Sequence, residues 1–236
     1  MALIAIGGDS GRGKSTSMRN LDPATTYLIQ TIPKPLPFPK WKTKYPLMDK
    51  KTWKGNRYVV FSSEFDEKKT NKEEFHNASN RVTNLLRLIP EKKPEIKTII
   101  IDDSQYIMSF EYMARGKEVG FNKFSELAQN FFSIIRQASA ISENINIVFL
   151  HHTEIANDIE KLKTSGKMID NHITLEGLFT IVLLAKIVKE NGKAKYKFIT
   201  HSDGTNTVKT PMGMFGEDEI DNDLVKVFNT ITKYEE

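Results

Sequence analysis

Cysteine is absent from the 236-residue chain, which excludes disulfide bonds and metal sites built on thiolates. No uninterrupted apolar run is long enough to span a bilayer. The apolar stretch at residues 2–6 is far too short to serve as a secretory signal. The simplest expectation is therefore a cytoplasmic protein that does not enter a membrane.

Charge is unevenly distributed along the chain, whose formal net charge is +4. Residues 217–236 contain seven acidic and two basic residues, and residues 31–57 contain eight basic residues and one aspartate. We expect an α/β core over 1–216, with 31–57 as a basic insertion rich in proline and aromatic residues, followed by an acidic C-terminal helix over 217–236. A basic body with an acidic tail favours a polyanionic partner. A solvated basic surface is the alternative.

A phosphate-binding loop is the clearest motif. The stretch "GDSGRGKS" at 8–15 fits G-x-x-x-x-G-K-[ST], between an apolar strand and residues that can begin a helix. Lys14 is predicted to reach the β- and γ-phosphates of ATP, where it would also assist catalysis, and Ser15 to ligate Mg²⁺. The predicted ATP-binding residues of the loop are Gly8, Asp9, Ser10, Gly11, Arg12, Gly13, Lys14, Ser15 and Thr16.

Two aspartates supply the carboxylate that such a metal needs. Asp102 and Asp103 follow the β-branched stretch 98–101, and the carboxyl ends of parallel strands face the ligand crevice in an open α/β sheet. We expect Asp102 to hold Mg²⁺ through a water molecule or through Ser15. The alternative is an aspartate that caps the following helix.

Hydrolysis also needs a group that activates water. Asp103 and Glu64 are both candidates, because Glu64 lies at the end of another predicted strand, within 57–66. A further strand ends at residue 150 and is followed by His151, His152 and Thr153, polar groups that can sense the γ-phosphate. No second ligand cluster supports zinc binding by the histidines.

The remaining pattern completes an α/β order. A strand is predicted at 25–30, and apolar spacing predicts helices at 71–89 and 123–141. Residues 179–200 read as a β-hairpin that turns at Asn191-Gly192. The fold class expected is α/β, a mainly parallel central sheet flanked by helices with a C-terminal β-hairpin.

This order resembles the RecA-like P-loop ATPase core, and more closely the compact phage-type RecA-like ATPases that act as single-strand annealing proteins. The stretches that resemble it are "GDSGRGKS", "TIIIDDSQY", "FNKFSELAQNFFSIIR", "IVFLHHTE", "GKMIDNHITLEGLFTIVL" and "TPMGMF". The resemblance implies an oligomer, ring or filament, in the host cytoplasm if the chain is phage-encoded. The sequence departs from the family pattern at two points. It has no N-terminal oligomerisation helix, and one strand ends in His-His-Thr where the family has Asn-Gln.

The resemblance also implies roles for particular residues. Glu64 would be the water-activating glutamate, and His151, His152 or Thr153 the sensor. Single-stranded DNA would contact one loop near 114–123 and another at about 154–172. A lysine such as Lys186, Lys189 or Lys209 would complete the ATP site of a neighbouring subunit. The candidate DNA contacts are Arg115, Lys117, Lys123, Lys161, Lys163 and Lys167, with a helix connector and a plain surface loop as the respective alternatives.

Segment 31–57 offers a further surface for single-stranded DNA, because its lysines alternate with aromatic residues. An ordered insertion that covers the core or a neighbouring subunit is the alternative. The function expected is an ATP-dependent protein that binds single-stranded DNA and promotes annealing or recombination, with Mg²⁺ and ATP as cofactors and a single-strand-binding protein as a possible partner. The alternatives are a helicase-like or packaging motor subunit, a P-loop kinase of a small substrate, and a non-enzymatic nucleotide switch.

Overall fold

A computed structural model describes residues 1–61, 72–120, 122–165 and 174–236 of the chain. Among these residues, no helix combines the length and apolarity that a membrane span requires. In chain order the elements are β1 (Leu3–Gly7), the 3₁₀ helix η1 (Ser15–Met18), β2 (Thr26–Gln30), α1 (Trp41–Lys44), β3 (Arg57–Val59), α2 (Lys72–Lys92), β4 (Thr98–Asp102), α3 (Gln105–Ala114), α4 (Asn122–Ile141), β5 (Asn146–His151), β6 (Thr153–Ala156), β7 (Ile159–Leu162), the 3₁₀ helix η2 (Leu175–Leu178), β8 (Ile181–Glu190), β9 (Lys193–Ile199), β10 (Glu219–Asp221) and α6 (Leu224–Glu235).

An eight-stranded sheet organises the molecule, in the order β10-β9-β8-β1-β5-β4-β2-β3. The six strands from β8 to β3 run parallel, and β9 and β10 are antiparallel additions at one edge. The predicted class, α/β with a mainly parallel sheet and a C-terminal hairpin, is therefore confirmed. Strand β5 lies between β1 and β4, with Gly7 level with His151, so three strand ends meet at one edge.

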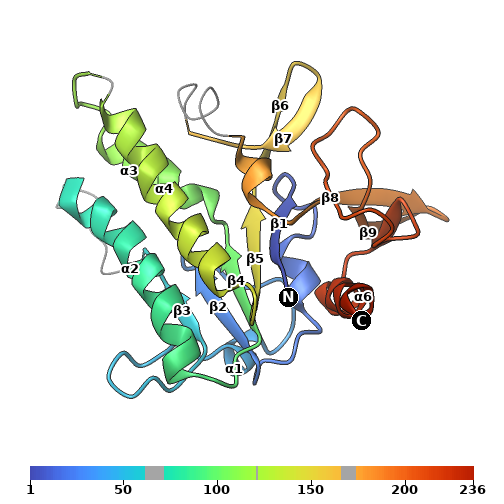
Figure 1. Cartoon of the computed structure of the whole chain (residues 1–236), viewed down its shortest axis with the longest axis horizontal. Coiled ribbons are helices and arrows are strands. Elements are labelled where there is room, and N and C mark those ends of the chain that lie inside the picture. Colours follow the sequence, from blue (N-terminus) through green and yellow to red (C-terminus); the bar gives the residue numbers. More distant parts are fainter. Residues whose placement is uncertain (62–71, 121, 166–173) are drawn as a thin grey trace.

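Helices cover both faces of this sheet (Figure 1). Alternate residues of β4 point to opposite faces: Ile99 and Ile101 pack under α2, α3 and α4, whereas Ile100 packs with residues of η1 and α6. This alternation follows from the two-residue period of a strand. The termini lie side by side, and the amino group of Met1 is 2.7 Å from the Glu235 carboxylate.

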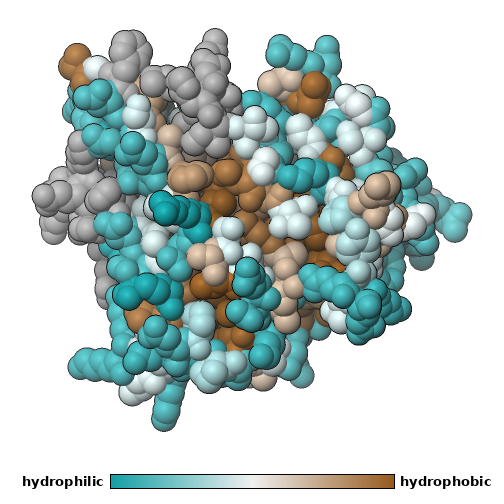
Figure 2. Space-filling view, viewed as in Figure 1, coloured by the Kyte–Doolittle hydropathy of each residue, from teal (hydrophilic) through white to brown (hydrophobic). Residues whose placement is uncertain are grey.

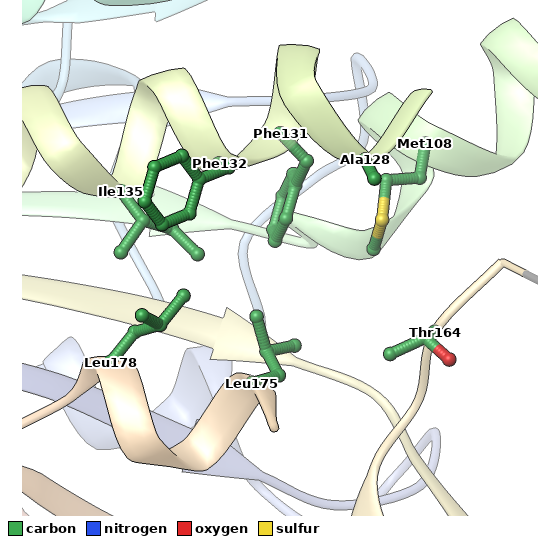
Figure 3. Close-up of a pocket in the computed structure, with 8 residues that line it drawn as sticks. All are labelled: Met108, Ala128, Phe131, Phe132, Ile135, Thr164, Leu175 and Leu178. Carbon is green, nitrogen blue, oxygen red and sulfur yellow. The ribbon is translucent and has the colours of Figure 1, made fainter. Parts of the chain in front are cut away.

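Helix α4 also faces η2 across an apolar gap. Figure 3 shows Phe131 and Ile135 of α4 opposite Leu175 and Leu178 of η2, with Thr164 at one end. The gap has a volume of about 10 Å³, roughly that of one water molecule, so it is packing space rather than a ligand site. Figure 2 shows apolar side chains gathered over this region and hydrophilic residues around them.

The predicted secondary structure needs correction at three places. The residues after the phosphate-binding loop form only the single turn η1, and the chain then leads into β2. Residues 219–221 of the predicted acidic helix form β10, so only Leu224–Glu235 is helical, capped by Asp223. The predicted loop 154–172 begins as the β6–β7 ribbon, whose Asn157-Asp158 turn has φ values of 51° and 62°.

The basic segment 31–57 is ordered and folded onto the body. Tyr45 is fully buried and Phe38 nearly so, and both lie in the core on the η1 face of the sheet. The Arg57 guanidinium lies 5.2 Å from the Trp41 ring centre. The aromatic residues of this segment thus cover the core, which is one of the two arrangements expected from the sequence.

Candidate functional site: the phosphate-binding loop and its carboxylates

The loop between β1 and η1 has the backbone that a phosphate cradle requires. Gly13 has a φ of 92°, which a residue with a side chain adopts only at a cost. A Cβ atom at Gly13 would lie 2.7 Å from Cδ1 of Tyr196 in β9. Glycine is therefore required here both by the turn and by the approach of a distant strand.

Lys14 is turned back into its own loop. Its Nζ donates to the carbonyl oxygens of Gly8 and Asp9, the second at 3.0 Å, and the residue is 6% exposed. Burial lowers the pKa of the Lys14 amine to about 8, although the charges of Asp103 and Asp102 act in the opposite direction. The loop thus encloses an amine whose carbonyl acceptors could be replaced by the oxygens of a triphosphate.

Ser15 and Asp102 meet across the sheet edge. Ser15 Oγ donates a hydrogen bond of 2.8 Å to Asp102 Oδ1, although the residues are 87 positions apart. Asp102 is fully buried, and its Oδ2 has no hydrogen-bond partner among the described residues. Burial, with the neighbouring charge of Asp103, raises the pKa of the Asp102 carboxyl. A hydroxyl and an unpaired carboxylate oxygen are ligands that suit Mg²⁺.

Mg²⁺ therefore fits this pair, in a site that phosphate oxygens would complete. No group of three or more histidine, aspartate or glutamate side chains that could hold a metal occurs within the described residues. Mg²⁺ in proteins commonly keeps several waters and binds substrate phosphates.

Asp103 has a different environment from its neighbour. Its carboxylate forms an ion pair with Lys34 and lies 3.5 Å from His152 Nε2. Burial acts to raise the pKa of this carboxyl, but the hydrogen bonds from His152 and Lys34 outweigh it and lower the pKa. The φ of Asp103 is 57°, in the left-handed region that a residue with a side chain seldom adopts. Lys34 was missed in the sequence because nothing local links the basic segment to Asp103.

The two strand-end histidines separate in the structure. His151 is fully enclosed, with Nδ1 2.8 Å from Ser104 Oγ and Nε2 2.7 Å from the Lys163 carbonyl. Burial lowers the pKa of its imidazole to about 4, so the ring is neutral and donates to that carbonyl from Nε2. Both ring nitrogens of His151 are thus bound within the protein, and the ATP contact of this residue stays a prediction. His152 remains at the site edge beside Asp103.

The loop is connected to the β6–β7 ribbon by a chain of polar contacts. Arg12 pairs with Asp9 and with Glu160 of β7, each at 2.7 Å. Thr153 Oγ1 donates to the same Glu160 oxygen at 2.8 Å. Thr153, the first residue of β6, thus shares a Glu160 oxygen with Arg12 of the loop.

The predicted DNA contacts lie in unequal settings. Arg115 is 2% exposed and pairs with Glu111, Glu118 and Glu126 at 2.9–3.0 Å. The charge of Arg115 is paired inside the protein, which does not favour the predicted contact with DNA. Of the other predicted DNA contacts, Lys117 and Lys163 are exposed and Lys123 and Lys161 are partly buried. Lys167 lies outside the described residues. Glu64, predicted to activate water, also lies outside them.

Triphosphate binding should weaken above the pKa of Lys14. The protonated amine attracts phosphate, and its pKa in the empty loop is about 8. As pH rises through 8, binding must take up a proton, and we expect affinity for ATP to fall by up to about tenfold per pH unit. ATP titrations at pH 7, 8 and 9 measure this. The Lys14→Arg variant, whose cation does not titrate there, should give a flatter profile, and equal slopes in both proteins would contradict the assignment.

A comparison with models of known protein families found no match, and a comparison with curated proteins found none either.

Proposed function

We propose that the chain is a magnesium-dependent ATPase that binds single-stranded DNA and promotes its annealing or recombination. The observation that supports ATP hydrolysis best is the Ser15–Asp102 hydrogen bond of 2.8 Å, beside a glycine-rich loop that encloses Lys14. These three groups come from two strand ends that the sheet brings together. Their arrangement matches the placement of phosphates and Mg²⁺ that phosphoryl transfer requires.

Each group has a defined task in this proposal. Lys14 exchanges its two carbonyl acceptors for phosphate oxygens, while the backbone N–H groups of the loop hold the remaining oxygens. Ser15 and Asp102 hold Mg²⁺, which when bound neutralises phosphate charge. His152 keeps Asp103 oriented at the edge of the site, where the γ-phosphate would lie.

The DNA part of the proposal is supported by the ribbon and its surroundings. Lys161 lies on β7 and the exposed Lys163 directly follows it. Lys161 is partly buried and lies 3.5 Å from the Glu154 carboxylate, so the exposed Lys163 is the better placed of the two for phosphate contacts that are independent of sequence. The Arg12–Glu160 pair joins this ribbon to the cradle, so the two proposed ligands would bind to connected parts of the molecule.

The test of this function is the rate of ATP hydrolysis with and without single-stranded DNA. We expect DNA to raise the rate several-fold at low salt and the effect to decline as salt rises. Duplex DNA of the same length is the control for strandedness. A rate that single-stranded DNA leaves unchanged, together with no ATP-dependent DNA binding in a shift assay, would overturn the DNA part. Phosphate transfer to a small acceptor would instead identify a kinase.

The water-activating carboxylate can be assigned by replacing each candidate with its amide. The Asp103 carboxylate is paired with Lys34 and His152 and is a weak proton acceptor. We therefore expect Glu64→Gln to lower turnover by roughly 10²–10⁴-fold with ATP binding retained, and Asp103→Asn to lower it less. Single-turnover rates with saturating ATP measure this. The reverse order would assign the role to Asp103.

A further inference from the structure

A cavity beside the phosphate cradle has the volume of a small-molecule site and a polar lining with one aromatic residue, Tyr196. Its volume is about 340 Å³, within the range of ligand pockets. Its lining comes from three parts of the chain: η1 and the residue after it, strand β9, and the stretch from the end of β10 to the first turn of α6. The lining residues are Thr16, Arg19, Lys195, Tyr196, Asp221, Asn222, Asp223 and Lys226.

Hydrogen bonds fasten these parts to the cradle. Arg19 Nη1 donates to the carbonyl of Thr16 at 3.1 Å and to the carbonyl of Asn222 at 2.6 Å. The Asn222 backbone N–H donates to the Tyr196 carbonyl at 3.3 Å. Tyr196 in turn lies against Gly13, as described above. The cavity therefore begins where the cradle ends and is held in register with it.

Most charged groups in the lining are already paired. Asp221 accepts from Lys197 at 3.0 Å and from Lys226 at 2.5 Å. Asp223 accepts from Asn20 through Oδ2 and from the Val225 N–H through Oδ1. These contacts use both oxygens of each carboxylate, so the acidic groups serve the fold and leave a lining without an unpaired anion.

Asn222 differs from its neighbours. The residue is 2% exposed, and neither Oδ1 nor Nδ2 of its amide has a hydrogen-bond partner among the described residues. Both atoms of a buried amide are rarely left unsatisfied in a native protein. One donor and one acceptor side by side form the pattern that pairs with the amino group and adjacent ring nitrogen of adenine.

We propose that this cavity binds the nucleobase of ATP, with Tyr196 stacking on the ring and the Asn222 amide pairing with its edge. The inference rests on the proposed function, because it extends the triphosphate site. Tyr196 is 41% exposed, so one part of its ring is free to stack. The acidic C-terminal segment thereby contributes to the nucleotide site.

The test compares three ligands on the full chain: ATP, purine riboside triphosphate, which lacks the 6-amino group, and inorganic tripolyphosphate. Calorimetry with Mg²⁺ gives each affinity. We expect wild type to bind ATP about tenfold more tightly than purine riboside triphosphate, and Asn222→Ala to lose that preference. We expect Tyr196→Ala to weaken ATP binding about tenfold, and Tyr196→Phe to leave it unchanged. Tripolyphosphate affinity should be the same in all four proteins.

The outcomes distinguish a failure of the proposed base site from a failure of the proposed function. If ATP binds no more tightly than tripolyphosphate, or if both alanine variants bind ATP as wild type does, the base site is overturned and the phosphate cradle stands. If wild type binds none of the three ligands, the proposed function is overturned as well. Thermal unfolding without ligand checks that Asn222→Ala folds, and Tyr196→Ala, at a partly exposed position, provides an independent arm.

Discussion

Lys14→Ala is expected to abolish measurable ATP turnover, with a loss in kcat/KM of at least about 10²–10³-fold. The lysine is the one residue of the cradle whose cation lies enclosed among the loop carbonyls of Gly8 and Asp9. Alanine removes the charge that would follow the phosphates in the transition state, and Lys34, a lysine on the same edge, is already paired with Asp103. Steady-state hydrolysis and ATP titration together measure the loss.

Lys233→Ala is the matched control, since Lys233 is exposed on α6. It should retain wild-type turnover and affinity. Circular dichroism of both variants separates a loss of function from a loss of fold. Turnover by Lys14→Ala within tenfold of wild type would contradict the assignment of the loop as the catalytic phosphate site.

Asp102→Asn is expected to change activity and stability in opposite directions. Turnover should fall by roughly 10²–10³-fold, because the amide loses the charge that holds Mg²⁺. The empty protein should become more stable at pH 7 by about 1 kcal/mol, because the pKa of this buried carboxyl is raised and its ionised form is disfavoured. The amide oxygen still accepts the Ser15 hydroxyl. Urea unfolding without nucleotide measures the stability.

The sign of the pH dependence follows from linkage. A carboxyl whose pKa is raised on folding binds more protons in the folded state, so its contribution to stability falls as pH rises from about 4 through the folded pKa. Asp103→Asn is the internal comparison, because the pKa of Asp103 is lowered and its contribution is present above its unfolded pKa. We expect Asp103→Asn to destabilise the protein. If both amides shift stability in the same direction, the environments assigned to the two carboxylates are wrong.

The parts of the site that follow from chain-local patterns were predictable. The glycine-lysine-serine spacing and the β-branched strand before Asp102 place Ser15 and Asp102 at one sheet edge, because parallel strands share a direction. The fold of the hairpin also follows from a local signal, the Asn191-Gly192 turn, with φ values of 52° and 74°. Such features depend on neighbours within a few residues.

Features made by distant segments were not predictable in the same way. Lys34 reaches Asp103, and Tyr196 reaches Gly13, through sheet order that no short pattern encodes. For Arg115 part of the evidence was local in sequence: Glu111 stands four residues before it, a spacing that brings side chains together on a helix, and Glu118 stands three residues after it. Its burial also depended on Glu126 from the next helix.

The Arg12–Glu160 contact has a thermodynamic consequence. If a bound triphosphate recruits the Arg12 guanidinium, Glu160 loses its 2.7 Å partner and the ribbon loses an anchor to the loop. Any ligand that prefers the released ribbon must then bind more tightly when the triphosphate is present. Reciprocity requires that this ligand strengthen triphosphate binding by the same factor. Through Arg12, binding at either site would thus raise the affinity of the other site.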